Sequence, residues 1–299
     1  GNSGFVSLLN SPGDQYVGLL TGDLASKRLN RTPLKMTVLG VGLKVKWRKE
    51  VDLTKDGIQT ELVDMMVDDR GRFYLLVREI TIKGTNSGKI DYFVLQYAKD
   101  REEALRIELG EFEAAASVRL GIDINADGQL ISSGFYTQVK KEGGQRAFIR
   151  VFDQNSGERI HASEINLDPE MLNADLTAKE IKGKADDLMR YPERNNLFRY
   201  KAIVPRSDGG SFLVGEEWRA VASSSSQRGM GSSSYNYYYH SIAVVGVDPE
   251  GNLEWTVKVP KRVRTDKEGG MTGSFLMASV RDKMVCYYTD HEKNAAVQL

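Results

Sequence analysis

Three histidines, His161, His240 and His291, are the side chains of this 299-residue chain that titrate near neutral pH. A catalytic or metal site needs several converging side chains, and no two of these histidines share the spacing of a helix face or a strand face. Cys286 is the single cysteine, so the chain can form no internal disulfide, and we expect no cysteine-based zinc site. The sequence therefore predicts no metal site and no cofactor.

Two neighbouring carboxylates, Glu216 and Glu217, end an apolar stretch and precede Trp218. A glycosidase-type acid/base pair needs two carboxyls that face each other across about 5 to 10 Å. Adjacent residues of a strand point to opposite faces of the sheet, so at most one of the two can serve a given pocket. An enzymatic site would therefore need groups from elsewhere in the chain. The candidates for such a site are Glu216, Glu217, Asp290 and His291.

Four tyrosines follow a serine-rich segment within five positions of one another. Tyrosine offers a flat apolar face and a hydroxyl at low entropic cost, which makes such a cluster a candidate recognition patch. Strand alternation would turn half of the cluster into the sheet. The sequence predicts a binding surface formed by Tyr235, Tyr237, Tyr238, Tyr239, His240 and Trp218.

The stretch from Ile242 to Pro260 contains the clearest structural pattern of the chain. An apolar strand is followed by an Asp-Pro-Glu-Gly turn, in which Pro249 presets φ and Gly251 accepts a conformation that other residues avoid. The second strand then alternates strictly, with one apolar face that we expect to be buried. That face consists of Leu253, Trp255, Val257 and Val259.

Weaker copies of this hairpin recur along the chain at a regular interval. Turns that carry Gly or Asp lie between apolar strands, and from Gly13 to Gly71 is 58 residues and from Gly71 to Gly128 is 57. The two later intervals are longer, and each contains an insertion. A second hairpin follows the first within each period, so each unit is predicted to have four antiparallel strands.

Four-stranded units at this spacing are typical of a β-propeller, whose blades stack face to face. We predict an all-β fold, a β-propeller of four-stranded antiparallel blades of which about five are visible, in a single domain over residues 1–299. The units cover roughly 5–53, 61–109, 117–167, 197–260 and 272–299.

Two insertions interrupt the repeats. The first, residues 168–196, opens with Asp168-Pro169, a cap followed by proline at a first helical position, and predicts a short helix near 177–190. The second, Ser223–Ser234, is rich in Ser and Gly and predicts a flexible loop between two strands.

The segment Gly251–Pro260 resembles the blade-ending strand of propeller repeats in secreted or envelope-anchored bacterial proteins, many from Bacteroidetes. Gly42–Trp47 is a looser copy, and Gly157–His161 has His where Trp is expected. The resemblance implies an extracellular or cell-envelope location, periplasmic or surface-anchored. It carries no catalytic residues, because such repeats belong to a fold that hosts many functions.

Charge and hydropathy limit the classes of partner. Lys plus Arg and Asp plus Glu number 41 each, so the formal net charge is zero, and we expect neither nucleic-acid binding nor attachment to an anionic membrane. No run approaches the roughly 20 apolar residues that a membrane-spanning helix needs. Two basic runs, residues 44–49 and 261–267, are expected on solvated surface.

Two functions are compatible with these patterns. The first is a non-catalytic binding or scaffold module of the cell envelope that recognises a glycan or a protein through one propeller face. The alternative is a glycan-acting hydrolase or lyase with its site at the mouth of a central channel. The sequence favours the first, because it contains a repeat pattern and a tyrosine cluster but no catalytic motif.

Overall fold

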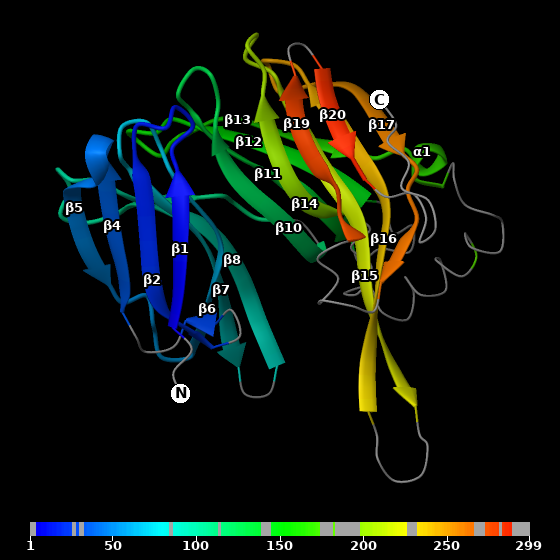
Figure 1. The fold of residues 1–299 in the computed structure, drawn as a ribbon, viewed down its shortest axis with the longest axis horizontal. Helices are drawn as coiled ribbons and strands as arrows, with labels where there is room; N and C mark the ends of the chain where they lie inside the picture. Colours follow the sequence, from blue (N-terminus) through cyan, green and yellow to red (C-terminus); the bar gives the residue numbers. More distant parts are fainter. Residues whose placement is uncertain are drawn as a thin grey trace. The chain divides into compact units, whose positions relative to one another are not determined.

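The computed structural model describes most of the chain as antiparallel β-strands (Figure 1). Its two compact units consist of Gly1–Phe112, Gly121–Ser133 and Ile149–Ala162, and of Glu113–Leu120, Gly134–Phe148 and Ser163–Leu299. The expectation of a single domain stays a prediction. The described residues are 4–25, 28–29, 33–83, 86–112, 115–138, 145–173, 182, 198–225, 232–265, 273–280 and 283–288.

The first two sets of four strands lie in one continuous sheet of nine strands. The short strand β3 joins them, because it pairs with the end of β2 and, at Arg28 opposite Glu61, with β6. The first set is β1 (Gly4–Asn10), β2 (Val17–Ala25), β4 (Leu34–Gly40) and β5 (Lys44–Val51), with β3 at Arg28–Leu29 and a 3₁₀ turn, η1, at Val41–Leu43. The second set is β6 (Ile58–Val67), β7 (Phe73–Lys83), β8 (Asn86–Tyr97) and β9 (Leu105–Glu108).

The third and fourth sets lie in separate antiparallel sheets, the third of four strands and the fourth of five with the short β18, and a strand pair follows. The third sheet is β10 (Ala115–Ile124), β11 (Leu130–Gln138), β12 (Gln145–Phe152) and β13 (Arg159–Asn166). The fourth is β14 (Arg199–Pro205), β15 (Ser211–Ser225), β16 (Ser232–Val247) and β17 (Leu253–Val259), with β18 (Val263–Thr265) paired to β16. The last pair is β19 (Leu276–Val280) and β20 (Lys283–Tyr287). The predicted fold class is confirmed: the protein is all-β, with four-stranded antiparallel sheets of the type that forms propeller blades.

Four of the hairpin turns share a geometry that explains why Gly recurs in them. In the second unit of the repeat, the N–H of Asp68 donates to the carbonyl of Arg72, and the N–H of Gly71 donates to the carbonyl of Asp68. The same pair of bonds recurs in three more hairpins, each with a glycine at a φ between 71° and 92°. A Cβ is disfavoured at such angles, so these turns select glycine. The four glycines are Gly71, Gly128, Gly209 and Gly251.

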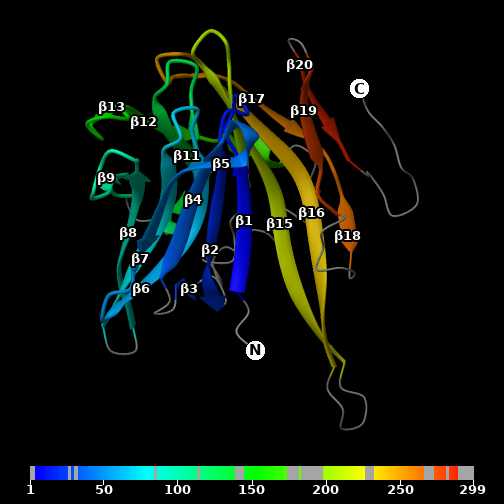
Figure 2. The ribbon, with the colours of Figure 1, turned by 60° about the vertical axis from the view of Figure 1, so that its left-hand side comes forward.

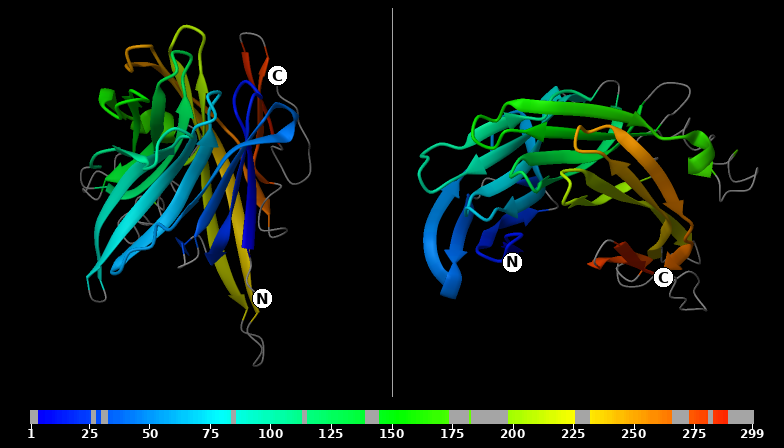
Figure 3. Two further views of the ribbon diagram at one scale, coloured as in Figure 1. Left: turned by 90° about the vertical axis from the view of Figure 1, so that its left-hand side faces the viewer. Right: turned by 90° about the horizontal axis from the view of Figure 1, so that it is seen from above.

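Each of the two compact units has an apolar core of its own, formed where the faces of its strands pack together. In the first unit, Leu20, Val38, Phe73 and Val77 are fully buried in one cluster that also contains Trp47. In the second, Val214, Ile242 and Val244 are buried, and apolar side chains of β19 and β20 pack against them. Figure 3 shows the ribbons of β19 and β20, in red, close to the other strands of this unit. Burial of this apolar surface is the main stabilising contribution to both units.

Two expectations from the sequence are wrong in detail. Ser223–Ser225 and Ser232–Ser234 do not form a loop, because they continue β15 and β16 with Ser223 opposite Ser234 (Figure 2). The apolar face of β17 is not buried, since Leu253, Trp255 and Val257 are each more than 40% exposed. Trp255 lies against Phe212, at 5.5 Å between ring centroids.

The first insertion begins as predicted. Helix α1 (Pro169–Asn173) starts at the proline, and the carboxylate of Asp168 accepts a hydrogen bond from the backbone N–H of Glu170 at 2.9 Å. The helix predicted near 177–190 lies, apart from Lys182, outside the described residues. No helix in the described parts of the chain has the length and apolar character required to cross a membrane.

A close backbone approach at Gly134 of β11 provides a test of the sheet packing. A Cβ added there would lie 2.0 Å from the carbonyl oxygen of Arg119 and 2.7 Å from the Cα of Leu120. We expect Gly134→Ala to lower the free energy of unfolding by about 3 kcal/mol, because the backbone of β10 would have to move. The control is Gly128→Ala, where nothing lies within 4 Å of the added carbon and only the positive φ opposes the change, at a cost of about 1 to 2 kcal/mol. Urea denaturation measures both, and an equal loss in the two variants would contradict the close approach.

Candidate functional site

The most concentrated group of charged and aromatic side chains in the second unit lies around a β-bulge in β15. The pairing of β15 with β16 shifts between Glu216 and Trp218, and β16 pairs with β17 on one side of this point and with β18 on the other. Bulges redirect side chains and are frequent next to functional sites. We call the group the β15 cluster; it consists of Arg199, Lys201, Glu216, Trp218, Tyr237, Tyr239, Lys261 and Ser274.

Glu216 holds the polar half of the cluster together. Its side chain is fully buried, and one carboxylate oxygen forms an ion pair with the equally buried Lys261. The other oxygen lies 2.8 Å from Nζ of Lys201 and accepts a hydrogen bond from Oγ of Ser274 at 2.7 Å. Lys201 also donates to that Oγ at 2.7 Å. Both carboxylate oxygens are therefore engaged with cationic or hydroxyl donors.

Lys261 is surrounded by apolar rings apart from its carboxylate partner. Its Nζ lies 5.4 Å from the ring centroid of Tyr239 and 5.8 Å from that of Phe275. Burial lowers the pKa of the Lys261 ammonium, the carboxylate of Glu216 opposes this shift, and the charge of Lys201 adds to it. The short contact with Glu216 and the cation–π contacts favour the charged form. This lysine is a structural cation, because it has no exposed surface through which a ligand could reach it.

Arg199, Trp218 and Tyr237 form the second, more exposed half of the cluster. The guanidinium of Arg199 stacks over the indole of Trp218 at 3.3 Å, and the ring centroids of Trp218 and Tyr237 lie 6.3 Å apart. All three side chains are half-buried. Burial and the nearby charge of Arg119 lower the pKa of Arg199. Arg199 has no ion-pair or hydrogen-bond partner among the described residues.

The residues predicted for a binding surface fall into two groups. Trp218, Tyr237 and Tyr239 belong to the β15 cluster. Tyr238 and His240 form a separate edge-to-face pair at 6.1 Å, with Arg264 5.9 Å from the Tyr238 ring. The alternation along β16 explains this separation. The side chain of Tyr235 lies outside the described residues.

The described part of the structure does not bring together the residues predicted for an enzymatic site. Both oxygens of Glu216 are engaged, Glu217 is half-buried with an interaction of its own, and Asp290 and His291 lie outside the described residues. The alternative of a hydrolase or lyase therefore stays a prediction. His161 is half-buried, and its Nε2 has no hydrogen-bond partner among the described residues.

Sequence reasoning missed the cations of the cluster. Lys261 was expected on solvated surface with the rest of the basic run 261–267, but it is only 1% exposed. The residue before it gave a hint of this. Pro260 ends the amphipathic strand, so the alternation of that strand does not assign the side chain of Lys261 to the solvent face. Arg199, Lys201 and Ser274 carry no local signal, since their role depends on contacts with residues far away in the sequence.

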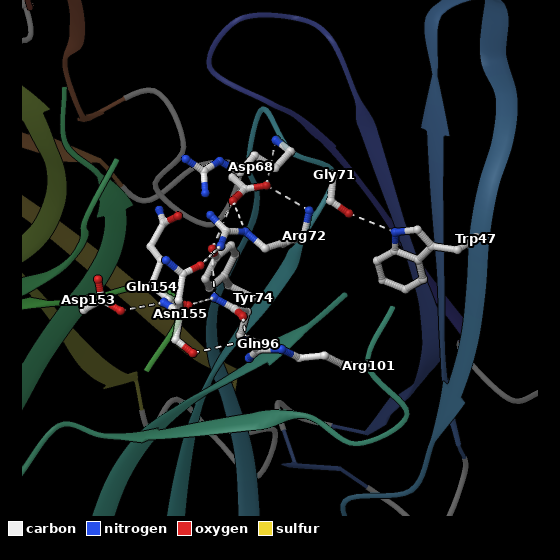
Figure 4. Close-up of polar contacts among 11 residues, drawn as sticks. Trp47, Asp68, Gly71, Arg72, Tyr74, Gln96, Arg101, Asp153, Gln154 and Asn155 are labelled. Atoms are coloured by element: carbon white, nitrogen blue, oxygen red, sulfur yellow. Dashed lines mark hydrogen bonds and ion pairs between the residues drawn. The ribbon is translucent and has the colours of Figure 1, made fainter. Parts of the chain in front are cut away.

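The first unit contains a second polar group, centred on Asp68 (Figure 4). The buried carboxylate of Asp68 accepts hydrogen bonds from Nε of Arg72 at 2.6 Å and from the hydroxyl of Tyr74 at 3.0 Å. Gln96 donates from Nε2 to Tyr74 and to the carbonyl of Gln154, at 3.1 and 2.7 Å. Burial and the adjacent carboxylate raise the pKa of Tyr74. The network joins the turn at Asp68 to the turn that contains Gln154, and the side chains of Asp68, Tyr74 and Gln96 all have partners within it, so we regard it as structural.

Two half-buried carboxyl groups of the first unit, Asp64 and Asp123, accept hydrogen bonds from backbone N–H groups. Asp64 lies at the bulge in β6 and accepts hydrogen bonds from the N–H groups of Met65 and Ile122 at 2.9 and 3.1 Å. Burial raises the pKa of Asp123 from 3.8 to about 6, its bond from the N–H of Ile124 opposes this, and the charge of Asp64 adds to it. Burial likewise raises the pKa of Asp64. Within the described part of the chain, no three His, Cys, Asp or Glu side chains are grouped to hold a metal ion.

Comparison with known proteins finds only distant structural similarity. No family model and no curated protein matches the chain. Among solved structures, a GH43 β-1,3-galactosidase matches 97% of this chain and 74% of its own at 10% identity and a TM-score of 0.37. An apocarotenoid oxygenase from Synechocystis matches 87% of this chain and 64% of its own, at 10% identity and a TM-score of 0.36. A prolyl oligopeptidase B from Galerina marginata matches 96% of this chain and 39% of its own, at 9% identity and a TM-score of 0.37. The chain thus spans less than two thirds of the latter two, and similarity at this level says nothing about its activity.

The buried ion pair predicts a specific pattern of stability. We expect Glu216→Gln to lower the free energy of unfolding by about 3 to 5 kcal/mol, because it leaves the buried charge of Lys261 without compensation. The double variant Glu216→Leu/Lys261→Met should recover most of that loss, since it removes both charges and keeps the volume. Urea denaturation of both variants checks this. A loss below about 1 kcal/mol for Glu216→Gln, the size typical of surface pairs, would show that the pair is not buried.

Asp123 predicts a dependence of stability on pH with a defined sign. Between about pH 4 and pH 6 the unfolded chain releases this proton while the folded chain retains it, so stability falls as pH rises through this window. Asp123→Asn removes the effect. The variant should gain about 1 to 3 kcal/mol relative to the natural chain at pH 7 and little at pH 4. Urea denaturation at both pH values, with the exposed turn variant Asp127→Asn as control, measures it; an equal difference at both would be the contrary result.

Proposed function

We propose that the protein is a non-catalytic binding module that recognises a glycan through the exposed half of the β15 cluster. The observation that carries the proposal is the stack of Arg199 on Trp218 at 3.3 Å, continued by Tyr237. Planar side chains that are already packed together lose little conformational entropy when a ligand binds. A flat apolar surface with polar edges suits a sugar ring, which has apolar C–H faces and hydroxyls around its rim.

Two features favour binding over catalysis at this place. The carboxylate of Glu216 is engaged by Lys261, Lys201 and Ser274, so a proton donor or acceptor for glycosidic cleavage is not provided by this group. The exposed half of the cluster consists of a cation and aromatic rings, which position ligands but do not transfer protons at neutral pH.

A small, ring-shaped ligand fits the cluster better than a protein surface. The three side chains of the stack are half-buried, whereas a stable protein interface needs about 800 Å² from each partner with exposed anchor residues. In keeping with the resemblance of the blade-ending strand to envelope proteins, we also propose an extracellular or cell-envelope location.

Replacement of Trp218 tests the proposal on a panel of immobilised neutral and acidic polysaccharides. We expect Trp218→Ala to weaken binding to the retained polysaccharide by about tenfold or more, because it removes the centre of the stack. Trp218→Phe should stay within about threefold, since an aromatic surface remains and the indole N–H has no partner among the described residues.

The matched control is Trp255→Ala, which removes the exposed tryptophan of β17 in the same sheet. Its affinity should equal that of the natural chain. If Trp255→Ala abolished binding and Trp218→Ala did not, the site would be on β17. If the natural chain retained no polysaccharide, the glycan proposal would be wrong.

A further inference from the structure

The β15 cluster contains more positive than negative charge. Three cations of the cluster, Arg199, Lys201 and Lys261, share one carboxylate within it, that of Glu216. Glu217, the next residue of β15, has an interaction of its own. The excess is local, because the chain as a whole has no net charge.

The excess charge is concentrated on Arg199. Glu216 is already saturated by Lys201, Lys261 and Ser274, so it offers no oxygen to a further donor. Arg199 is half-buried without an ion-pair or hydrogen-bond partner among the described residues. An unpaired cation that is partly withdrawn from water is unfavourable in the free protein, and an anion that pairs with it recovers that cost.

The stack on Trp218 fixes how Arg199 can bind. One face of the guanidinium is covered by the indole at 3.3 Å, so its N–H groups are directed along the edge of the plane. Such an edge matches the two oxygens of a carboxylate or a sulfate, which accept two parallel hydrogen bonds. Lys201, two residues further along β14, is already paired with Glu216, so Arg199 is the cation of the cluster left for a ligand.

We infer that the ligand of the β15 cluster is an anionic polysaccharide, whose carboxylate or sulfate group pairs with Arg199 while the sugar ring packs along Trp218 and Tyr237. This inference rests on the proposed function and narrows it to acidic glycans. Uronate and sulfated polymers share the chemistry that Arg199 recognises.

Polymers that differ in their anionic groups distinguish the contribution of the charge to binding from that of the sugar ring. Dextran and dextran sulfate have the same backbone, and alginate supplies carboxylates instead of sulfates. We expect the full chain to bind dextran sulfate or alginate at least about tenfold more tightly than dextran, with weaker binding as NaCl rises from about 50 to about 500 mM. The tighter of the two anionic polymers identifies the anionic group.

Substitutions at Arg199 test the geometry. Arg199→Gln should weaken anionic binding by about tenfold or more, and Arg199→Lys should recover only part of it, because lysine keeps the charge but not the planar fork. The control Arg48→Gln removes an exposed arginine of β5 and should leave affinity unchanged. Circular dichroism confirms that each variant is folded.

Three results would overturn the inference, and only the third would also contradict the proposed function. Anionic binding that is unchanged in Arg199→Gln, or equally reduced in Arg48→Gln, assigns the charge to another surface. If dextran bound as tightly as the anionic polymers, independently of salt but dependent on Trp218, the inference of an acidic ligand would be wrong and the proposed glycan site would still hold. If no polymer is bound in a Trp218-dependent way, the proposed function and this inference both fail.

Discussion

A carboxylate buried inside a β-sheet must be compensated within the protein, and in the second unit this constraint organises the surroundings of β15. Glu216 requires donors on both oxygens, and it obtains them from Lys201, Lys261 and Ser274 on three separate segments. The ion pair contributes little net stability relative to an apolar core, because desolvation of both charges offsets their attraction. Its effect is on position: it fixes the residues after β17 and before β19 against the bulge, where the aromatic half of the cluster is built.

The same constraint explains why the polar atoms around Glu216 are all engaged with one another, whereas the edge of the Arg199 guanidinium is not engaged by any described residue. A glutamate next to a serine and two lysines has the composition of a catalytic site, but each polar atom is already used by a neighbour. Arg199 has no carboxylate partner of this kind among the described residues. Rigid support on one face and an unsatisfied edge on the other are the conditions under which a side chain binds a ligand with little reorganisation.

Much of the fold could be predicted from the sequence because its determinants are local. Gly71 and Gly251 mark turns whose backbone angles exclude other residues, and the apolar alternation between such turns defines strands in sets of four. The site could be predicted only in part, because its aromatic members lie in one sequence segment while Arg199 and Lys261 meet it through tertiary pairing. Lys261 belongs to a basic run that follows a strand, and such runs are ordinarily assigned to solvent, so the ion pair that buries it could be seen only in the structure.

Comparison of two tryptophans shows the limit of a repeated motif. Trp47 and Trp255 occupy the same register in their hairpins, opposite Val38 and Gly246, and in both the pairing shifts at the next position. Trp47 is buried and donates from Nε1 to the carbonyl of Gly71 at 2.9 Å, whereas Trp255 is 42% exposed.

The residue opposite the tryptophan accounts for this difference. A Cβ at Gly246 would lie 2.5 Å from the indole of Trp255, so this ring rests on the backbone of its own sheet. Val38 fills the corresponding space with its own side chain, and the indole of Trp47 instead packs into the core of the first unit. The motif thus specifies the turn and the register of the strand, while a single cross-strand neighbour decides whether its tryptophan is part of the core or of the surface.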